Sequence, residues 1–393
     1  MSRMDDHGTT SRNRPISGKW RLCAAILLCL AWGLAGGAPA ALAATDCADE
    51  TATGIPRAEC EALMALYQRA DGAGWTQNAG WNTDAAANEW HGVTVEEGRV
   101  TELLLYANQL SGPVPPELGN LPNLRSLGLD GNELTGPIPP ELGNLANLRF
   151  LWLDANRLEG PVPPALGNLG NLESLYLEGN RLSGEIPVEF TGLTNLIEGV
   201  IGFNMLTASA PDLVAFLDRK FILWSRTQTV PPTDLAVGTI SETAVRLVWE
   251  PIPFTAHGGH YRILSATDPG GPYALAGTTT DKSASEYTVA GLTLGTTYHF
   301  VVETFTPAHA ANPNDLVSAP SAEISATPSD VRRIPGDANA DDRVDLADAI
   351  LILRILAGID AGDAIDAAAD VSGDARLGLE DLIYILRVVS REG

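Results

Sequence analysis

Leucines and asparagines recur with a fixed period of 24 residues between residues 100 and 206. Each copy follows the frame L-x-x-L-x-L-x-x-N-x-L, in which apolar and polar positions alternate before a turn. The turn asparagines are Asn108, Asn132, Asn156, Asn180 and Asn204. A short strand cannot bury its leucine face alone, so the period predicts coils that stack around one continuous core. We expect the asparagine side chains to bond inward-facing backbone groups at each bend.

The segments between the strands share the wording L-x-G-P-[IV]-P-P-x-L-G-N-L, as in Ser111 to Asn120 and Thr135 to Asn144. This wording resembles the plant-type leucine-rich repeats, a resemblance that implies a β-rich solenoid over residues 100–228. The fifth copy has Gly199 and Ile201 in place of two leucines, as expected of a terminal repeat.

Both flanks of the repeats indicate caps that shield the ends of the core. In the upstream flank, residues 45–99, apolar side chains between Glu61 and Tyr67 predict a short amphipathic helix. Tryptophans follow in Gly/Asn-rich turns, and the stretch resembles the N-terminal cap of the same repeat family, although Thr94 stands where many plant members carry cysteine. Downstream, Pro211 to Phe221 predicts a closing helix begun by Ser209 and Pro211.

The residues between the leucines of each strand are expected on the concave face of the solenoid. Aromatic and acidic side chains gather there: Tyr106, Asp130, Trp152, Asp154, Tyr176 and Glu178. Such a lane suits sugar rings with their hydroxyls, or a basic peptide. The alternative is that the aromatic rings only pack against one another along the ladder.

Residues 229–328 change to period-two strands separated by turns such as Asp268 to Gly271, which predicts an all-β, immunoglobulin-like sandwich. Trp249 on an early strand and Tyr298 at the start of a late one resemble the core tryptophan and corner tyrosine of a fibronectin type III domain. The resemblance implies a spacer. The sequence contains no Arg-Gly-Asp triplet, and four of its histidines, His257, His260, His299 and His309, are not at metal-ligand spacing.

The C-terminal segment, residues 334–393, contains two loops with oxygen side chains at calcium-ligand spacing. The first loop offers Asp337, Asn339, Asp341, the Arg343 carbonyl, Asp345 and Asp348, and the second offers Asp370, Ser372, Asp374, the Arg376 carbonyl and Asp381. We therefore expect two calcium ions. Because Gly378 and Ala375 replace an oxygen ligand and a turn residue in the second loop, the first site is expected to be the tighter one.

Each loop leads into an amphipathic helix, predicted over Ala347–Leu356 and Glu380–Val389. Two such loop-helix copies resemble a type I dockerin, which implies a small all-α module and a cohesin as partner. The family's Ser-Thr-like recognition pair is replaced here by Leu346-Ala347 and Leu379-Glu380. With Arg354 and Arg387, these residues are the expected partner contacts, whether the partner is a cohesin or another extracellular protein.

The N-terminus carries basic residues, an apolar run from Leu22 to Leu34 and an Ala-x-Ala site near Ala43, so residues 1–44 are expected to be a signal peptide. This predicts a secreted protein without membrane insertion after cleavage, in which Cys47 and Cys60 form a disulfide. The net charge of -24 disfavours nucleic acid and anionic membranes as partners.

The sequence shows no nucleophile-base arrangement, no phosphate loop and no stretch left over for a catalytic domain. We therefore expect a non-catalytic protein that docks through calcium loops into an extracellular assembly and presents the solenoid to a protein, peptide or glycan. In the alternative, a free-standing secreted binding protein uses its calcium loops only for stability. A third option is a component that hydrolyses glycosyl bonds, since dockerins accompany polysaccharide-degrading enzymes and carboxylate pairs are present.

Overall fold

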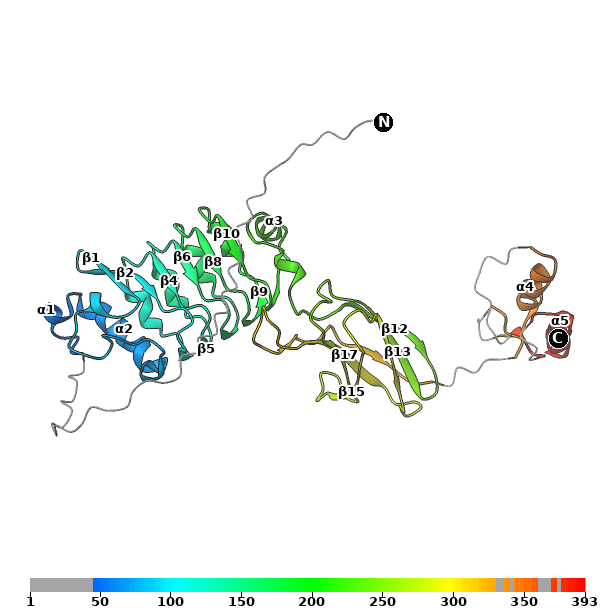
Figure 1. Ribbon diagram of the computed structural model, residues 1–393. Helices are drawn as coiled ribbons and strands as arrows, with labels where there is room; N and C mark the ends of the chain where they lie inside the picture. The colour runs from blue at the N-terminus through cyan, green and yellow to red at the C-terminus, as the bar shows by residue number, and fades with distance from the viewer. Residues whose placement is uncertain (1–44, 330–334, 340–342, 360–368, 373–375, 393) are drawn as a thin grey trace, which may run out of the picture. The chain divides into compact units, whose positions relative to one another are not determined.

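The computed structural model describes residues 45–329, 335–339, 343–359, 369–372 and 376–392 (Figure 1). The expected signal peptide and the predicted ligands Asp341 and Asp374 lie outside the described residues. Within them, no helix has both the length and the apolar character needed to cross a membrane.

Two parallel sheets run along the solenoid, one on each side of its leucine core (Figure 1). The main sheet has the order β1-β2-β4-β6-β8-β10, in which only β1 and β2 are antiparallel. Its strands are β1 Val93–Glu96, β2 Arg99–Leu104, β4 Ser126–Gly128, β6 Phe150–Trp152, β8 Ser174–Tyr176 and β10 Glu198–Val200. The second sheet contains β3 Ser111–Pro113, β5 Glu133–Gly136, β7 Arg157–Gly160, β9 Arg181–Glu185 and β11 Met205–Thr207.

Short 3₁₀ helices return the chain from the second sheet to the main sheet. They are η3 Pro116–Asn120, η4 Pro140–Asn144, η5 Pro164–Asn168 and η6 Val188–Gly192. The first three begin with proline, whose fixed φ and missing N–H suit the first helical position. One leucine of each helix, such as Leu142, joins the strand leucines in a core that is fully buried, which confirms the predicted stacking.

The turn asparagines form the predicted ladder inside the solenoid. The Asn156 amide donates to the Leu129 carbonyl of the preceding repeat at 2.9 Å, and its oxygen accepts the Leu134 N–H at 2.9 Å. The ladder continues one step further than predicted, because Gln228 accepts the Leu206 N–H and donates to the Ile201 carbonyl. Gln228 lies 24 residues after Asn204, so the period itself contained this signal.

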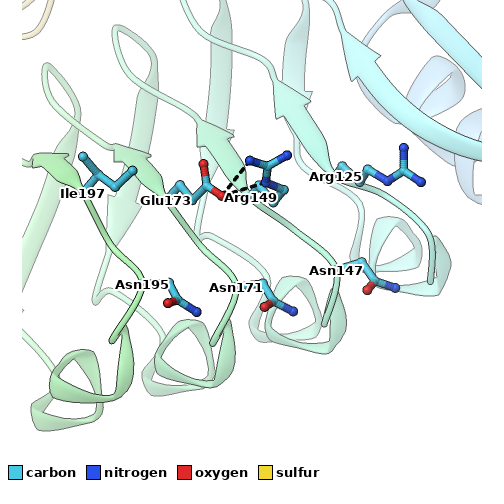
Figure 2. Close-up of a pocket in the computed structure, with 7 residues that line it drawn as sticks. All are labelled: Arg125, Asn147, Arg149, Asn171, Glu173, Asn195 and Ile197. Atoms are coloured by element: carbon cyan, nitrogen blue, oxygen red, sulfur yellow. Dashed lines mark hydrogen bonds and ion pairs between the residues drawn. The ribbon is translucent and has the colours of Figure 1, made fainter.

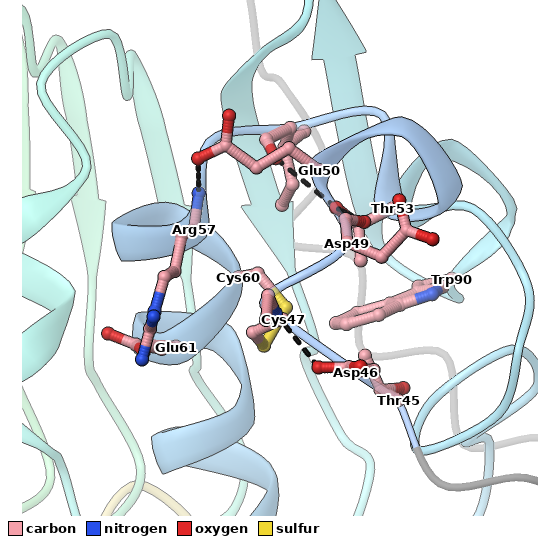
Figure 3. Close-up of a disulfide and its surroundings, with 12 residues drawn as sticks. Thr45, Asp46, Cys47, Asp49, Glu50, Thr53, Arg57, Cys60, Glu61 and Trp90 are labelled. Atoms are coloured by element: carbon pink, nitrogen blue, oxygen red, sulfur yellow. Dashed lines mark hydrogen bonds and ion pairs between the residues drawn. A yellow bond between two sulfur atoms is a disulfide. The ribbon is translucent and has the colours of Figure 1, made fainter.

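The N-terminal cap contains α1 Glu50–Thr53, α2 Arg57–Arg69, η1 Gly72–Gly74 and η2 Ala87–Glu89. The predicted disulfide between Cys47 and Cys60 is present and ties the chain before α1 to helix α2 (Figure 3). Helix α2 also carries the buried Glu59, whose carboxylate accepts from Arg99 and from the Val100 N–H at 2.8 Å. The cap is therefore bonded to the first repeat through a buried acid as well as through apolar packing.

The C-terminal cap consists of helix α3 Pro211–Lys220 and η7 Trp224–Arg226. The expectation that Ser209 begins the helix was wrong: Ala210 is the N-cap, and the Ser209 hydroxyl donates to Glu185 at 2.7 Å. Phe221 explains the degenerate fifth repeat, since its ring lies where a side chain on Gly199 would be. The cap thus replaces a leucine of the core with an aromatic ring.

The next module is a sandwich of two antiparallel sheets, as predicted. One sheet holds β12 Thr233–Ile240, β13 Ala244–Glu250 and β16 Glu286–Ala290, and the other holds β14 His260–Ala266, β15 Ala274–Thr278, β17 Tyr298–Thr306, β18 Leu316–Val317 and β19 Ile324–Ala326. Trp249 is buried between them. The Tyr298 hydroxyl accepts the Thr293 N–H at 3.1 Å, the corner arrangement that the sequence suggested.

Helices α4 Leu346–Leu356 and α5 Leu379–Glu392 follow, each close to its predicted range. They pack through a small buried cluster of Ala338, Ala349, Ile352, Ala369, Leu382 and Ile385. Asp345 caps α4 by accepting the Ala347 N–H, and Asp348 completes a capping box. The C-terminal segment is therefore all-α within its described residues.

Candidate binding surfaces of the solenoid and the C-terminal loops

The concave face is defined by the side chains between the leucines of the main sheet. Strand register aligns Leu104, Gly128, Trp152, Tyr176 and Val200 in one row. The positions two residues later form a second row, with Tyr106, Asp130, Asp154, Glu178 and Gly202. The expectation that Tyr106 lies in one lane with Trp152 and Tyr176 was wrong, because the 24-residue register places Tyr106 ahead of the acids.

Three carboxylates follow one another in the second row, which we call the acid ladder: Asp130, Asp154 and Glu178. Their backbones are held in step, since Gly131 N–H bonds the Asp154 carbonyl at 2.9 Å and Ala155 N–H bonds that of Glu178 at 2.8 Å. Neighbouring parallel strands lie about 4.8 Å apart, so like charges are brought close together. The sequence predicted the three residues and the structure aligns them in one row.

Asp154, at the centre of the acid ladder, is the most perturbed acid. Burial, and then the charge of Asp130, raises the pKa of Asp154 to about 7. Burial also raises the pKa of Asp130 and of Glu178. In the described part of the chain, the Asp154 Oδ1 oxygen is buried and has no hydrogen-bond partner. A buried acceptor without a donor is costly, so the ladder is a site that a cationic donor would stabilise.

The aromatic side chains beside the ladder are already engaged within the protein. The Trp152 indole N–H donates to the Ser174 hydroxyl at 3.2 Å, and the Tyr176 hydroxyl donates to Glu198 at 2.8 Å. Burial and this bond to Glu198 raise the pKa of Tyr176 to about 12. Phe150, which the sequence reasoning did not single out, lies 5.7 Å from Trp152 between ring centres. Part of the predicted aromatic lane therefore packs along the ladder.

A second hollow, of about 590 Å³, lies beside the N-terminal ends of the main-sheet strands (Figure 2). Its lining residues are Arg125, Asn147, Arg149, Asn171, Glu173, Asn195 and Ile197. Arg149 pairs with Glu173 at 2.7 Å and Arg125 with Glu96 at 2.7 Å. The Asn171 amide donates to the Ala146 carbonyl of the preceding repeat. The polar groups of this hollow therefore bond one another, unlike those of the acid ladder.

The histidines of the sandwich are not as scattered in space as in sequence. His257 and His309 stack with ring centres 4.1 Å apart, and the His309 ring lies 5.2 Å from Phe203 of the last repeat. Among the described residues, no group of three or more His, Cys, Asp or Glu side chains is placed to hold a metal ion. The structure thus gives these histidines a packing role.

The described parts of the two predicted calcium loops share one pattern of hydrogen bonds. Asp348 Oδ1 accepts the N–H groups of Ala338 and Asn339, and its Oδ2 accepts that of Asp345. Asp381, 33 residues later, accepts from Val371, Ser372 and Gly378 in the same way. Of the other predicted ligands, Asp337 is buried and Asp370 accepts from the Ser372 hydroxyl at 3.1 Å. The ligation itself stays a prediction, because the fifth position of each loop lies outside the described residues.

The six predicted partner contacts of the C-terminal segment are all exposed: Leu346, Ala347, Arg354, Leu379, Glu380 and Arg387. Further apolar side chains extend the two leucines along each helix. Ile350 and Leu353 follow Leu346 on α4, and Ile383 and Leu386 follow Leu379 at the same spacing on α5. Each helix therefore presents an apolar stripe outside the small core, which the sequence analysis had noted only at its first position.

Comparisons with known proteins place leucine-rich repeats in this chain. The family model described as Leucine Rich Repeat matches residues 123–145, 147–169 and 171–193. A comparison with curated proteins found no match.

Among solved structures, the chain is similar to three that illustrate the matches. It shares 27% identity with PEPR1-AtPEP1, covering 41% of this chain and 23% of that one, with a TM-score of 0.37. It shares 32% with the ectodomain of the Arabidopsis thaliana receptor kinase GASSHO1/SCHENGEN3 in complex with CASPARIAN STRIP INTEGRITY FACTOR 2, covering 41% and 20%, with a TM-score of 0.38. For the BIR2 ectodomain from Arabidopsis thaliana the identity is 35%, the coverage 39% and 84%, and the TM-score 0.36.

The chain thus spans less than a quarter of the first two of these structures. The residues matched by the family model coincide with the 24-residue period and with the stacked strands. Residues 123–193 are leucine-rich repeats.

Proposed function

We propose that this chain is a secreted, non-catalytic recognition protein whose concave face binds a basic peptide segment. The observation that carries the proposal is Asp154, an acid with a buried, unpartnered oxygen in the described structure, placed between Asp130 and Glu178. A lysine or arginine side chain supplies both the missing donor and the positive charge. A glycan is less favoured, because the nearby Trp152 and Tyr176 use their polar atoms within the protein.

The proposal is tested by titrating the purified chain with a set of short peptides that differ only in charge. Peptides with two or three arginines should bind at low salt, while matched peptides with citrulline in place of arginine should not. The Asp154→Asn variant should lose at least about tenfold in affinity, as expected for a desolvated ion pair. The matched control Glu159→Gln, an exposed acid of the same repeat, should bind like the parent. Equal binding of arginine and citrulline peptides would contradict the proposal.

We further propose that the C-terminal segment is a dockerin-like calcium module that attaches the chain to a cohesin-like or other extracellular protein, with a fibronectin type III-like sandwich as spacer. The recurrence of one hydrogen-bond pattern at Asp348 and Asp381 supports two copies of one loop. The acidic oxygens of both loops are the ligand type that calcium prefers, and they would hold two ions. The repeated apolar stripes on α4 and α5 favour a docking role over a purely structural one.

Attachment is tested by capturing partners of the full chain from the extracellular fraction, with calcium and with chelator. A partner retained only with calcium, and lost in the double variant Leu346→Glu and Leu379→Glu, supports docking. The control Leu294→Glu changes a leucine of the sandwich that is 54% exposed, similar to Leu346 at 58%. If the C-terminal helices gain stability from calcium but no partner is retained, the loops serve stability alone and the chain is a free-standing binding protein.

A further inference from the structure

A loop of the sandwich already occupies part of a repeated hydrogen-bonding surface on the solenoid. The loop, residues 307–315, joins β17 to β18 and contains two fully or nearly fully buried asparagines, Asn312 and Asn314. The Asn312 amide donates to the Phe203 carbonyl at 2.9 Å and to that of Asn180 at 3.3 Å. The Asn314 amide donates to the carbonyls of Asn156 at 2.7 Å and Gly179 at 3.3 Å.

The acceptor carbonyls repeat with the period of the solenoid. Asn312 uses the pair Phe203 and Asn180, and Asn314 uses the pair that lies 24 residues earlier, Gly179 and Asn156. We call this row of paired backbone oxygens the carbonyl track. Two loop residues, two positions apart, therefore advance by one repeat along it.

The next pair of the carbonyl track, 24 residues earlier again, is Ala155 and Asn132. Within the described part of the chain, no donor bonds the backbone oxygen of either residue. Both residues line a hollow of about 330 Å³ that begins at Pro313 of the loop. The track ends one repeat further on, because the Asn108 carbonyl accepts the Thr76 N–H of the cap at 3.1 Å. One full pair is thus open, directly beside the occupied pairs.

The open pair has the same local geometry as the occupied ones. Ala155 has a φ of 51°, which matches the values of 66° at Gly179 and 52° at Phe203. At Gly179 the loop comes so close that an added Cβ would lie 2.9 Å from the Ala311 carbonyl oxygen. At the corresponding Gly131 the nearest atoms belong to the neighbouring Ala107, at 3.6 Å or more. A chain of the same thickness as the loop therefore fits the open part.

The charge around the hollow selects a neutral occupant. Its two charged lining residues, Glu133 and Arg157, pair with each other at 3.2 Å. Backbone oxygens accept hydrogen bonds and repel carboxylates, so a side-chain amide suits them and an acid does not.

We propose that the open pair of the carbonyl track binds an extended peptide of a partner protein through an asparagine side chain. The peptide continues the course of the loop 307–315, and its amide donates to the carbonyls of Ala155 and Asn132 as Asn314 does to those of Gly179 and Asn156. The occupied pairs are the template for the contact. This surface is separate from the acid ladder and binds a different chemistry.

The test uses the full chain and a fluorescent peptide with the sequence of residues 308–316, which carries the Asn-Pro-Asn segment. Control peptides carry Asp or Ala at both asparagine positions. The variant Ala155→Asn places a side chain over the open pair, and asparagine tolerates the positive φ at this position. The control Ala146→Asn makes the same change at an exposed turn between η4 and β6.

We expect the parent chain and Ala146→Asn to bind the asparagine peptide, and Ala155→Asn to lose at least about tenfold in affinity. The Asp and Ala peptides should each bind at least about tenfold more weakly than the parent peptide. Binding of all three peptides alike, binding unchanged in Ala155→Asn, or no binding at millimolar peptide would each overturn the proposal. Because Asp154→Asn should leave this binding unchanged, its result is independent of the basic-peptide proposal.

Discussion

Replacing Asp154 by asparagine should stabilise the solenoid at neutral and alkaline pH. Burial raises the pKa of Asp154 from 3.8 to about 7, so the folded chain holds this proton more tightly than the unfolded chain. The unfolded state then binds fewer protons between about pH 4 and pH 7, and stability falls as the pH rises through this window. The asparagine side chain of the variant has no charge to desolvate or to repel Asp130, so the variant lacks this penalty.

The size of the effect follows from the shift. A change of about three pKa units corresponds to an upper limit of about 4 kcal/mol at a pH above 7. Asp154 is only partly buried, and solvent screens part of its interactions with Asp130 and Glu178, so we expect about 2 kcal/mol. For a unit of this size, that gain raises the thermal midpoint by roughly 4 to 8 °C.

The assay is thermal unfolding followed by tryptophan fluorescence at pH 5 and pH 8. Five of the six tryptophans in the described residues lie in the repeats or their caps, so the signal reports mainly on the solenoid: Trp75, Trp81, Trp90, Trp152 and Trp224. The gain of Asp154→Asn should appear at pH 8 and be small at pH 5, while Glu159→Gln should change neither midpoint. An equal loss of stability at both pH values would refute the reasoning, since it would mean that Asp154 makes favourable contacts.

Four other perturbations test the rest of the structure. Asn156→Ala leaves the buried Leu134 N–H and Leu129 carbonyl without partners and should cost about 2 to 4 kcal/mol in chemical unfolding of the solenoid, whereas the exposed Asn195→Ala should cost under about 1 kcal/mol. Removing the disulfide with Cys47→Ser and Cys60→Ser should cost about 3 kcal/mol, from the loop entropy of its 13-residue separation, and an unchanged thermal midpoint would contradict this. Asn312→Ala with Asn314→Ala should raise proteolytic cleavage within residues 307–315 by about tenfold, because the loop loses its bonds to the solenoid; unchanged cleavage would show that these bonds are not needed. Calcium at about 100 times its dissociation constant should stabilise the C-terminal helices by about 2.7 kcal/mol for each site, with Asp348→Ala more damaging than Asp381→Ala; calorimetry with the reverse order of affinities would contradict the expected tighter first site.

The periodic parts of the structure were predictable because one physical requirement repeats along the chain. The frame around Asn156 specifies strand, turn and buried ladder together, and the same applies to the alternating strand that carries Trp249. Cys47 and Cys60 were predictable because they are the only cysteine pair after residue 44. Local patterns of this kind depend on neighbours in sequence or on a neighbouring repeat.

Features that depend on distant segments could not be predicted in this way. Ser209 has the residue type of a helix cap, but Glu185 of the preceding repeat binds its hydroxyl. The perturbation of Asp154 requires the register of three strands as well as burial. The contacts of Asn312 and Asn314 join positions more than 100 residues apart, and neither residue belongs to a motif. Gln228 is intermediate, since its place in the period was readable but its residue type departs from the asparagine frame.

The most direct test of the central claim is the proton balance of peptide binding at pH 7, measured by titration calorimetry in two buffers of different ionisation enthalpy. An arginine side chain on the acid ladder stabilises the charged form of Asp154 and lowers its pKa, so binding should release about half a proton. The Asp154→Asn variant should release almost none. Binding of the arginine peptide without proton release in the parent chain would contradict recognition by the acid ladder.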